Sequence, residues 1–233
     1  MNKKNKIRVT ILVLFLSCIL ITIEILTYKP SPNKIFYNAI ESIVELKACS
    51  DKMENYGTAV VIGKEGLLAT NAHVVTYKSE NEYRVYDKCF IRFATENEYR
   101  EVSVVKYDIQ EDIAILKCDS KDINFKEINI GDGKNVYFGN SVYAIGNTEN
   151  GGLSITKGIV SIPHIVMEYD NIKREVIQSD LVIASGNSGG ALLDEYGRLI
   201  GITSFRRKDN YGNVVYGVAY SIPIEKIIKY IES

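Results

Sequence analysis

The sequence predicts an all-β domain of barrel or sandwich type that follows one apolar N-terminal helix. Three observations predict this architecture: many short hydrophobic runs are separated by turn residues, strands and helices do not alternate, and one long uncharged run lies near the N-terminus. The 233 residues include 46% hydrophobic and 24% charged side chains, a composition that can bury a core. The length accommodates one or two barrels.

Residues 1–30 combine a basic flank with an apolar run of membrane length. Only Glu24 interrupts the stretch between Arg8 and Lys29, and at ~1.5 Å per residue a helix of this length spans about 30 Å, the thickness of the hydrocarbon core. Basic residues favour the cytoplasmic side, so we expect residues 31–233 outside, in a single-pass protein of the cell membrane. The alternative is a cleaved signal peptide and a secreted protein, although no small-x-small cleavage site is evident. The basic residues are Lys3, Lys4, Lys6 and Arg8.

Short strands are expected to dominate the chain after a linker at residues 31–37. Gly63 and Gly66 lie between the first two predicted strands, where hairpin turns favour positive φ. The C-terminal end differs, because isoleucines repeat there at helical spacing after Ser221, a candidate cap, and Pro223, which suits a first helical turn. The predicted strands cover residues 58–62, 67–70, 84–93, 101–107, 113–117, 141–145, 155–161, 176–179, 199–205 and 214–220, and the isoleucines are Ile224, Ile227, Ile228 and Ile231.

Charge and cysteine content argue against several classes of protein. The formal net charge of −1 suggests no phosphate-binding surface, so we expect no nucleic-acid partner. Cys18 lies in the apolar run, and the three remaining cysteines cannot all pair within one chain, nor does their spacing select a pair. They are Cys49, Cys89 and Cys118. No CxxC motif or Cys/His cluster suggests a metal, no P-loop motif is present, and we expect no cofactor.

A serine framed by glycines is the strongest chemical signal, at Gly186-Asn187-Ser188-Gly189-Gly190. Glycines allow a tight turn, expose amide hydrogens and let a substrate carbonyl approach. A serine alcohol is a weak nucleophile, so it needs a base beside it and donors for the developing oxyanion. Taken alone, the segment also fits a glycine-rich hairpin turn.

Few side chains can serve as the base, because the chain has two histidines. His73 follows an apolar strand, whereas His164 has no comparable context and fits a surface or packing role. Asp112 leads straight into an apolar strand, where a carboxylate must be hydrogen-bonded and a histidine N–H can satisfy it. Taken singly, His73 also fits a structural histidine and Asp112 a turn residue, with Glu111 as an adjacent decoy.

Together the motifs occur in the order His, Asp, Ser, the chain order of the chymotrypsin arrangement. They resemble the HtrA/Deg branch of the trypsin-like serine proteases, over roughly residues 40–230. The segments that carry the resemblance are residues 70–75, 112–116, 144–147, 156–161, 178–180, 186–190 and 219–223.

The resemblance implies two antiparallel six-stranded β-barrels packed face to face, with a C-terminal helix. The first barrel, residues 38–125, would carry His73 and Asp112, and the second, residues 126–233, would carry Ser188. Ser188 would attack the peptide carbonyl, His73 would transfer the proton and Asp112 would orient the ring. The backbone amides of Gly186 and Ser188 would form the oxyanion hole, with Asn187 shaping the turn between them.

The resemblance also implies where substrate binds. Val182, six residues before the nucleophile, would form the base of the pocket for the side chain before the cleaved bond, with Ile183 and Ala184 along its wall. An aliphatic base predicts cleavage after Val, Ala or Ile. Asp180 is expected to anchor loop backbone instead of lining this pocket. Three further residues would offer backbone to an extended substrate strand: Ser204, Phe205 and Arg206.

The implied function is a serine endopeptidase that hydrolyses unfolded, damaged or signalling proteins outside the cytoplasm. Many HtrA proteins carry a PDZ domain after the protease, but this chain ends at Ser233, so we expect no regulation by such a domain in cis. Asn187 replaces the aspartate of digestive relatives, so activation by N-terminal clipping is not expected. HtrA relatives also suggest a homo-oligomer, commonly a trimer. The competing hypothesis is a catalytically silent protease fold that binds or senses at the membrane.

Overall fold

The computed structural model describes residues 2–169, 172–209 and 211–233. The chain divides into two compact units, one ending at Ser31 and one formed by Pro32–Ser233. The first contains helix α1 (Lys3–Thr27). Its segment Lys3–Ile25 is long and apolar enough to cross a membrane, a test that an N-terminal signal sequence also passes.

Six strands close the first barrel of the second unit, in the order β1-β2-β3-β8-β7-β6. A short helix, α3 (Ala72–Val75), and a separate hairpin of β4 (Thr76–Ser79) and β5 (Glu82–Val85) follow the third strand. The barrel strands are β1 (Ile43–Ser50), β2 (Met53–Gly63), β3 (Leu67–Thr70), β6 (Lys88–Phe93), β7 (Arg100–Asp108) and β8 (Ile113–Lys117).

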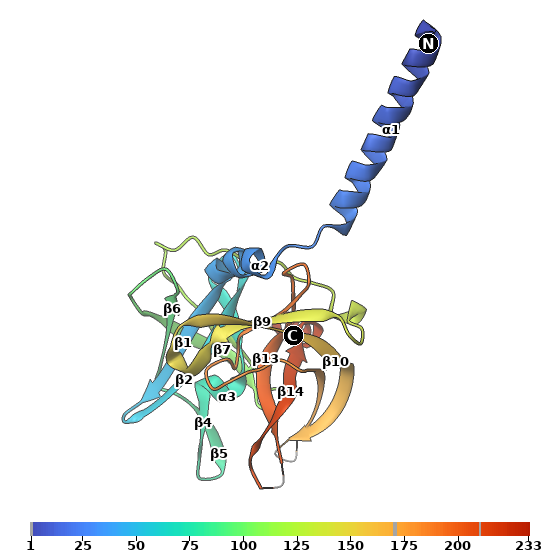
Figure 1. Cartoon of the computed structure of the whole chain (residues 1–233). Helices are drawn as coiled ribbons and strands as arrows, with labels where there is room; N and C mark the ends of the chain where they lie inside the picture. Colours follow the sequence, from blue (N-terminus) through green and yellow to red (C-terminus); the bar gives the residue numbers. More distant parts are fainter. Residues whose placement is uncertain (1, 170–171, 210) are drawn as a thin grey trace. The chain divides into compact units, whose positions relative to one another are not determined.

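Six further strands close the second barrel, in the order β10-β11-β14-β13-β12-β9. Figure 1 shows the first barrel in blue to green and the second in yellow to red. The strands are β9 (Ser141–Asn147), β10 (Leu153–Tyr169), β11 (Ile172–Ser179), β12 (Ala191–Asp194), β13 (Leu199–Lys208) and β14 (Val214–Pro223), and helix α4 (Ile224–Glu232) ends the chain. Short 3₁₀ helices cover Ile40–Ser42, Gly133–Asn135 and Thr148–Asn150. The all-β fold of two six-stranded barrels with a C-terminal helix is confirmed.

Alternation of side chains along the strands explains how the barrels pack together. Successive side chains of a strand point to opposite faces. In β2, Ala59 and Val61 therefore point into the first barrel, whereas Val60 between them joins a second cluster with Ile145 and Leu193 of the other barrel. All of these side chains are buried. The interface between the barrels is thus a hydrophobic core of its own, and it holds their facing loops in a fixed arrangement.

Three local expectations differ from the structure. Helix α2 (Pro32–Ala39) occupies most of the expected linker at residues 31–37, because Ile35 and Ala39 are buried in the core between the barrels. Ser221 lies in β14, and α4 instead begins after Pro223, without a side-chain cap. The run at residues 84–93 is divided between β5 and β6.

All four cysteines of the chain are free thiols.

Candidate active site

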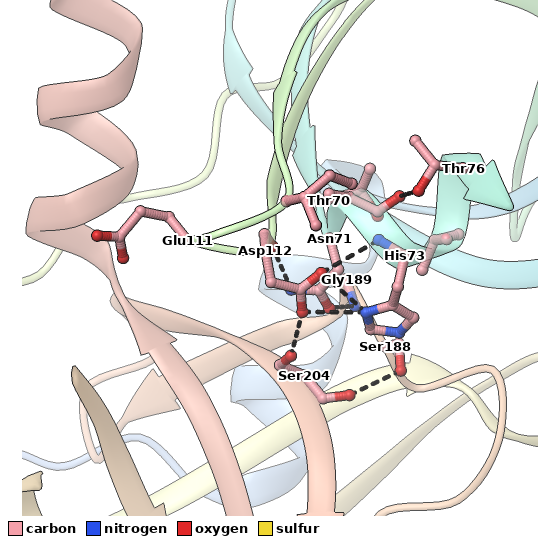
Figure 2. Close-up of polar contacts among 12 residues, drawn as sticks. Thr70, Asn71, His73, Thr76, Glu111, Asp112, Ser188, Gly189 and Ser204 are labelled. Carbon is pink, nitrogen blue, oxygen red and sulfur yellow. Dashed lines mark hydrogen bonds and ion pairs between the residues drawn. The ribbon is translucent and has the colours of Figure 1, made fainter. Parts of the chain in front are cut away.

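Three side chains that are distant in the sequence meet where the barrels face each other (Figure 2). His73 lies on α3 and Asp112 immediately precedes β8, both in the first barrel, whereas Ser188 lies in the turn before β12 of the second. The Nδ1 atom of His73 is 2.9 Å and 3.0 Å from the two carboxylate oxygens of Asp112. Glu111, the neighbouring carboxylate, instead pairs with Lys226.

Asp112 is a buried carboxylate whose hydrogen bonds are satisfied. Its Oδ1 accepts the backbone N–H of His73 at 3.1 Å, and its Oδ2 accepts the hydroxyl of Ser204 at 2.5 Å. Burial raises the pKa of Asp112, but the opposing effects of His73 and of these hydrogen bonds are larger, so the pKa lies below its usual value. Asp112 therefore stays ionised and fixes the orientation of the imidazole.

The environment of His73 keeps its basicity high. Burial lowers the pKa of the imidazole and the Arg174 cation lowers it further, but the charge and hydrogen bond of Asp112 raise it above the ordinary value of 6.5. With Nδ1 held by the carboxylate, Nε2 is the nitrogen that can exchange a proton. The side chain is 47% exposed, so the ring can meet a substrate.

In this structure the hydroxyl of Ser188 donates to the backbone carbonyl of Ser204 at 2.8 Å. No hydrogen bond joins Ser188 to His73 in the part of the chain that the structure describes. Ser204 places Ser188 near the pair, because its carbonyl accepts the Ser188 hydroxyl while its own hydroxyl donates to Asp112, as Figure 2 shows. Hydrogen bonds at active sites are commonly looser before substrate binds.

Thr58 of β2 ties the Ser188 turn, residues 185–190, to the first barrel. Its N–H donates to the Ser188 carbonyl at 2.9 Å, and its hydroxyl donates to the Gly186 carbonyl at 2.7 Å. The same hydroxyl accepts the N–H of Asn147 at 2.8 Å. Because Thr58 is fully buried, these bonds fix the turn without competition from water.

Gly189 is required by close approach of the two barrels. A Cβ atom there would lie 2.0 Å from the Thr58 carbonyl and 2.1 Å from the Thr70 hydroxyl, and the residue has a φ of +83°. Its N–H donates to Asn71 Oδ1 at 2.7 Å, and the amide of Asn71 donates to the Asp112 carbonyl at 3.0 Å. Asn71 thus connects the backbone beside Ser188 to that of Asp112.

Hydrogen bonds engage the carbonyls of the turn before Ser188. The Ser185 carbonyl accepts the N–H of Glu149 at 2.7 Å, and Gly186 has a φ of +88°. Within the described ranges, the amides of Gly186 and Ser188 donate to no other residue. The side chain of Asn187 is buried, and its Oδ1 accepts the hydroxyl of Thr148 at 2.9 Å.

The expected substrate-binding residues divide between two cavities. Val182, Ile183 and Arg206 line a cavity of about 10 Å³, and Val182 is 63% exposed. Phe205 lines a different cavity, of about 220 Å³, together with His73. Ala184 and Ser204 line neither of them. Asp180 accepts the backbone N–H of Ile159 at 2.6 Å, as a backbone anchor does.

Four polar residues near the site carried no signal of their role in the sequence: Thr58, Asn147, Thr148 and Arg174. Each contacts the site through hydrogen bonds to residues far along the chain. Asn147 lies in a segment that carries the resemblance, residues 144–147, and the other three belong to no such segment. Among the described residues, no group of three His, Cys, Asp or Glu side chains could hold a metal ion.

Most of the chain is similar to known proteins. Residues 57–202 match the family model of the trypsin-like peptidase domain. Protease Do-like 5 of Arabidopsis thaliana chloroplasts is 30% identical over 86% of this chain and 65% of its own length. Serine endoprotease DegS of Haemophilus influenzae is 31% identical over 75% of this chain and 48% of its own length.

Solved structures share the fold. The HtrA-type protease AlgW with a tripeptide has a TM-score of 0.73 at 28% identity, over 88% of this chain and 63% of that chain. A serine endoprotease from Yersinia pestis has a TM-score of 0.68 at 26% identity, over 88% and 66%. This chain therefore spans less than two thirds of the length of each of these four relatives.

Proposed function

Because this chain belongs to the trypsin-like peptidase family, and within it to the HtrA/Deg type, we propose that it is a serine endopeptidase with His73, Asp112 and Ser188 as its triad. The observation that carries this proposal is the convergence of the Asp112–His73 pair and Ser188 from different barrels. A structural histidine or a turn aspartate alone would not require a glycine-framed serine beside it.

In the proposed reaction, the Ser188 hydroxyl turns from the Ser204 carbonyl to His73 Nε2. Nε2 takes the proton while Ser188 Oγ bonds to the substrate carbonyl carbon. The intermediate collapses when His73 gives this proton to the leaving amine, the C–N bond breaks and an ester remains on Ser188. Water then attacks the ester with the same proton transfers, which releases the new carboxyl group and restores the serine. Asp112 stays ionised throughout.

We assign the oxyanion hole to the backbone amides of Gly186 and Ser188. Both lack acceptors within the described chain, while the carbonyls of Ser185 and Gly186 are engaged elsewhere. Donors that are already oriented stabilise developing negative charge without reorganisation during the reaction. Asn187, held by Thr148, shapes the turn between them.

Substrate is proposed to bind as an extended strand beside residues 204–206 of β13. Pairing of β13 with β12 ends at Ile202 and the Thr203 backbone bonds to Gly189 and Gly190, so an added strand would continue the ladder beyond them, next to Ser188. The side chain before the cleaved bond would then enter the cavity at Val182 and Ile183. Since a cavity of about 10 Å³ holds no more than one water, it must widen for a substrate, and small or medium aliphatic groups require the least widening.

The proposed place of action is outside the cytoplasm, at the cell membrane. Support comes from α1, whose length and composition suit a membrane span, and from relatives such as the probable periplasmic serine endoprotease of Buchnera aphidicola. The substrates would be unfolded, damaged or signalling proteins, and the active form a homo-oligomer, by resemblance a trimer.

Labelling with a fluorophosphonate probe, combined with peptide hydrolysis, tests the proposal. We expect the native protein to be labelled, and both Ser188→Ala and His73→Ala to lose at least about 10⁴-fold in hydrolysis rate because the triad acts as a unit. His164→Ala is the matched control, since His164 pairs with Glu175 on the surface and should retain activity. Hydrolysis by Ser188→Ala at the native rate would refute the nucleophile, and an unlabelled native protein would favour the silent binding module.

A further inference from the structure

Arg174 is a buried cation that crosses from the second barrel to the first. It lies on β11 and is only 7% exposed. Its Nε donates to the Gln110 carbonyl and its Nη2 to the Ile109 carbonyl, both at 2.6 Å. These carbonyls belong to the loop that leads into Asp112.

No carboxylate compensates this charge within the described part of the chain. Carbonyl dipoles offset only part of the cost of burying a guanidinium, so a buried arginine usually has an ionised partner. Asp112 is the nearby candidate, but both of its oxygens are engaged by His73 and Ser204. Arg174 therefore forms no ion pair among the described residues, and its guanidinium is able to bind an added anion.

Arg174 has unused N–H groups and lines a cavity beside the triad. A guanidinium has five N–H groups, and two of them are used by the carbonyls. Arg174 lines the cavity of about 220 Å³ that His73 also lines. Each nitrogen of its side chain either has a hydrogen-bond partner or is accessible to solvent. Its unused donors are therefore accessible, and this cavity is one that Arg174 lines. Asp112, whose carboxylate is bonded to His73 and Ser204, also lines the cavity, and the remaining lining is mostly apolar: Thr76, Tyr83, Ile109, Ile172 and Phe205.

The cavity lies where a substrate strand would place one particular side chain. Successive side chains of an extended strand point to opposite sides. If the residue before the cleaved bond points to the cavity at Val182, the residue preceding it points the other way, toward His73 and Phe205. Arg174 would thus meet the second residue on the N-terminal side of the cleaved bond.

We propose that Arg174 selects substrates that carry a glutamate or aspartate at this second position. The apolar walls would pack on the methylene groups, and the carboxylate would accept hydrogen bonds from the guanidinium, which are about twice as strong as those between neutral groups. This inference rests on the proposed function, because it assumes that a peptide occupies the cleft.

Paired peptides that differ only by Glu or Gln at this position test the inference. We expect kcat/KM of the native protein to favour the Glu peptide by about 10-fold or more, and Arg174→Gln to bring the ratio close to one. Arg174→Lys keeps the charge but not the planar fork, so it should retain an intermediate preference. Lys173→Gln removes the same charge from the exposed neighbouring position, and we expect it to keep the native ratio.

A native ratio near one would overturn the inference. Equal losses for both peptides in Arg174→Gln, with the native preference kept, would show that Arg174 only holds the loop before Asp112. Affinities of the two peptides for Ser188→Ala separate this inference from the proposed function. If the native protein hydrolyses neither peptide while Ser188→Ala binds the Glu peptide preferentially, the Arg174 site is supported and the protease is refuted.

Discussion

At the scale of single residues, the Asp112–His73 pair shows how the site offsets the effect of burial on the pKa of each group. Each side chain alone would be pushed toward its neutral form, yet each favours the charged form of the other. Asp112 keeps its charge because three donors surround the carboxylate: the imidazole, the His73 N–H and the Ser204 hydroxyl. The consequence for catalysis is a histidine that is a stronger base than a free imidazole.

We predict that activity falls on acidification at a pH above about 6.5, because the pKa of folded His73 is raised and its protonated form cannot act as base. The folding stability that His73 contributes changes with pH in the opposite direction. A raised pKa in the folded state favours folding below the unfolded value near 6.5, and this contribution is lost as pH rises through the folded pKa. Mild acid should therefore inactivate a protein that stays folded. Profiles of kcat/KM and circular dichroism against pH measure both effects, and a rate that stays flat down to about pH 4 would contradict a histidine base.

A second prediction at this scale concerns the residue before the cleaved bond. Val182 and Ile183 present aliphatic groups, and Asp180 is held by the Ile159 backbone, so no carboxylate is expected to receive a basic side chain. We expect cleavage after Val, Ala or Ile, with ~0.8 kcal/mol gained per buried methylene. Mass spectrometry of a digested peptide library measures the profile. Dominant cleavage after Arg or Lys would show that the pocket assignment is wrong.

At the scale of elements, β2 supports the Ser188 turn that the second barrel carries. Thr58 joins this strand to the carbonyls of Gly186 and Ser188 and to the N–H of Asn147. The glycines of the turn allow this approach, since side chains at Gly186 and Gly189 would collide with backbone carbonyls. The turn is therefore shaped by the packing of two elements and not by its own residues alone.

We predict that Thr58→Val reduces kcat by about 10-fold or more with a smaller effect on KM. The change keeps the shape of the side chain but leaves the Gly186 carbonyl and the Asn147 N–H without a partner, at about 1–3 kcal/mol for a buried group. Thr58→Ser retains the hydroxyl and serves as the control. Steady-state kinetics and thermal unfolding measure the effects. Native kcat in a folded Thr58→Val protein would show that the turn does not depend on this hydroxyl.

At the scale of the whole molecule, the site exists only where two barrels meet. His73 and Asp112 come from one barrel and Ser188 from the other, and a buried cluster that includes Val60, Ile145 and Leu193 holds the barrels together. Pro32–Ser233 forms a compact unit of its own, separate from the unit that contains α1. The catalytic arrangement should therefore be independent of the N-terminal helix.

We predict that the full chain fractionates with membranes and that protease added outside cells removes the catalytic unit. A variant without residues 2–31 should be recovered in the soluble fraction and should still be labelled by the fluorophosphonate probe. The expectation follows from the apolar helix Lys3–Thr27 and the separate compact unit. Mass spectrometry of the N-terminus completes the test, because a native soluble form that begins near residue 25–30 would identify a cleaved signal.

The sequence by itself determined the features that depend on neighbouring residues: the strands, the terminal helices and the motifs around His73, Asp112 and Ser188. Side-chain periodicity and glycine in a tight turn are local requirements, so they leave local patterns. The tertiary structure alone decided the roles of Thr58 and Arg174, as well as the placement of α2 against the core. Thr58 acts on Gly186, which lies 128 residues away. The role of such a residue depends on where the packing of the barrels places its hydroxyl or guanidinium group. The residues around it in the sequence therefore form no pattern that indicates this role.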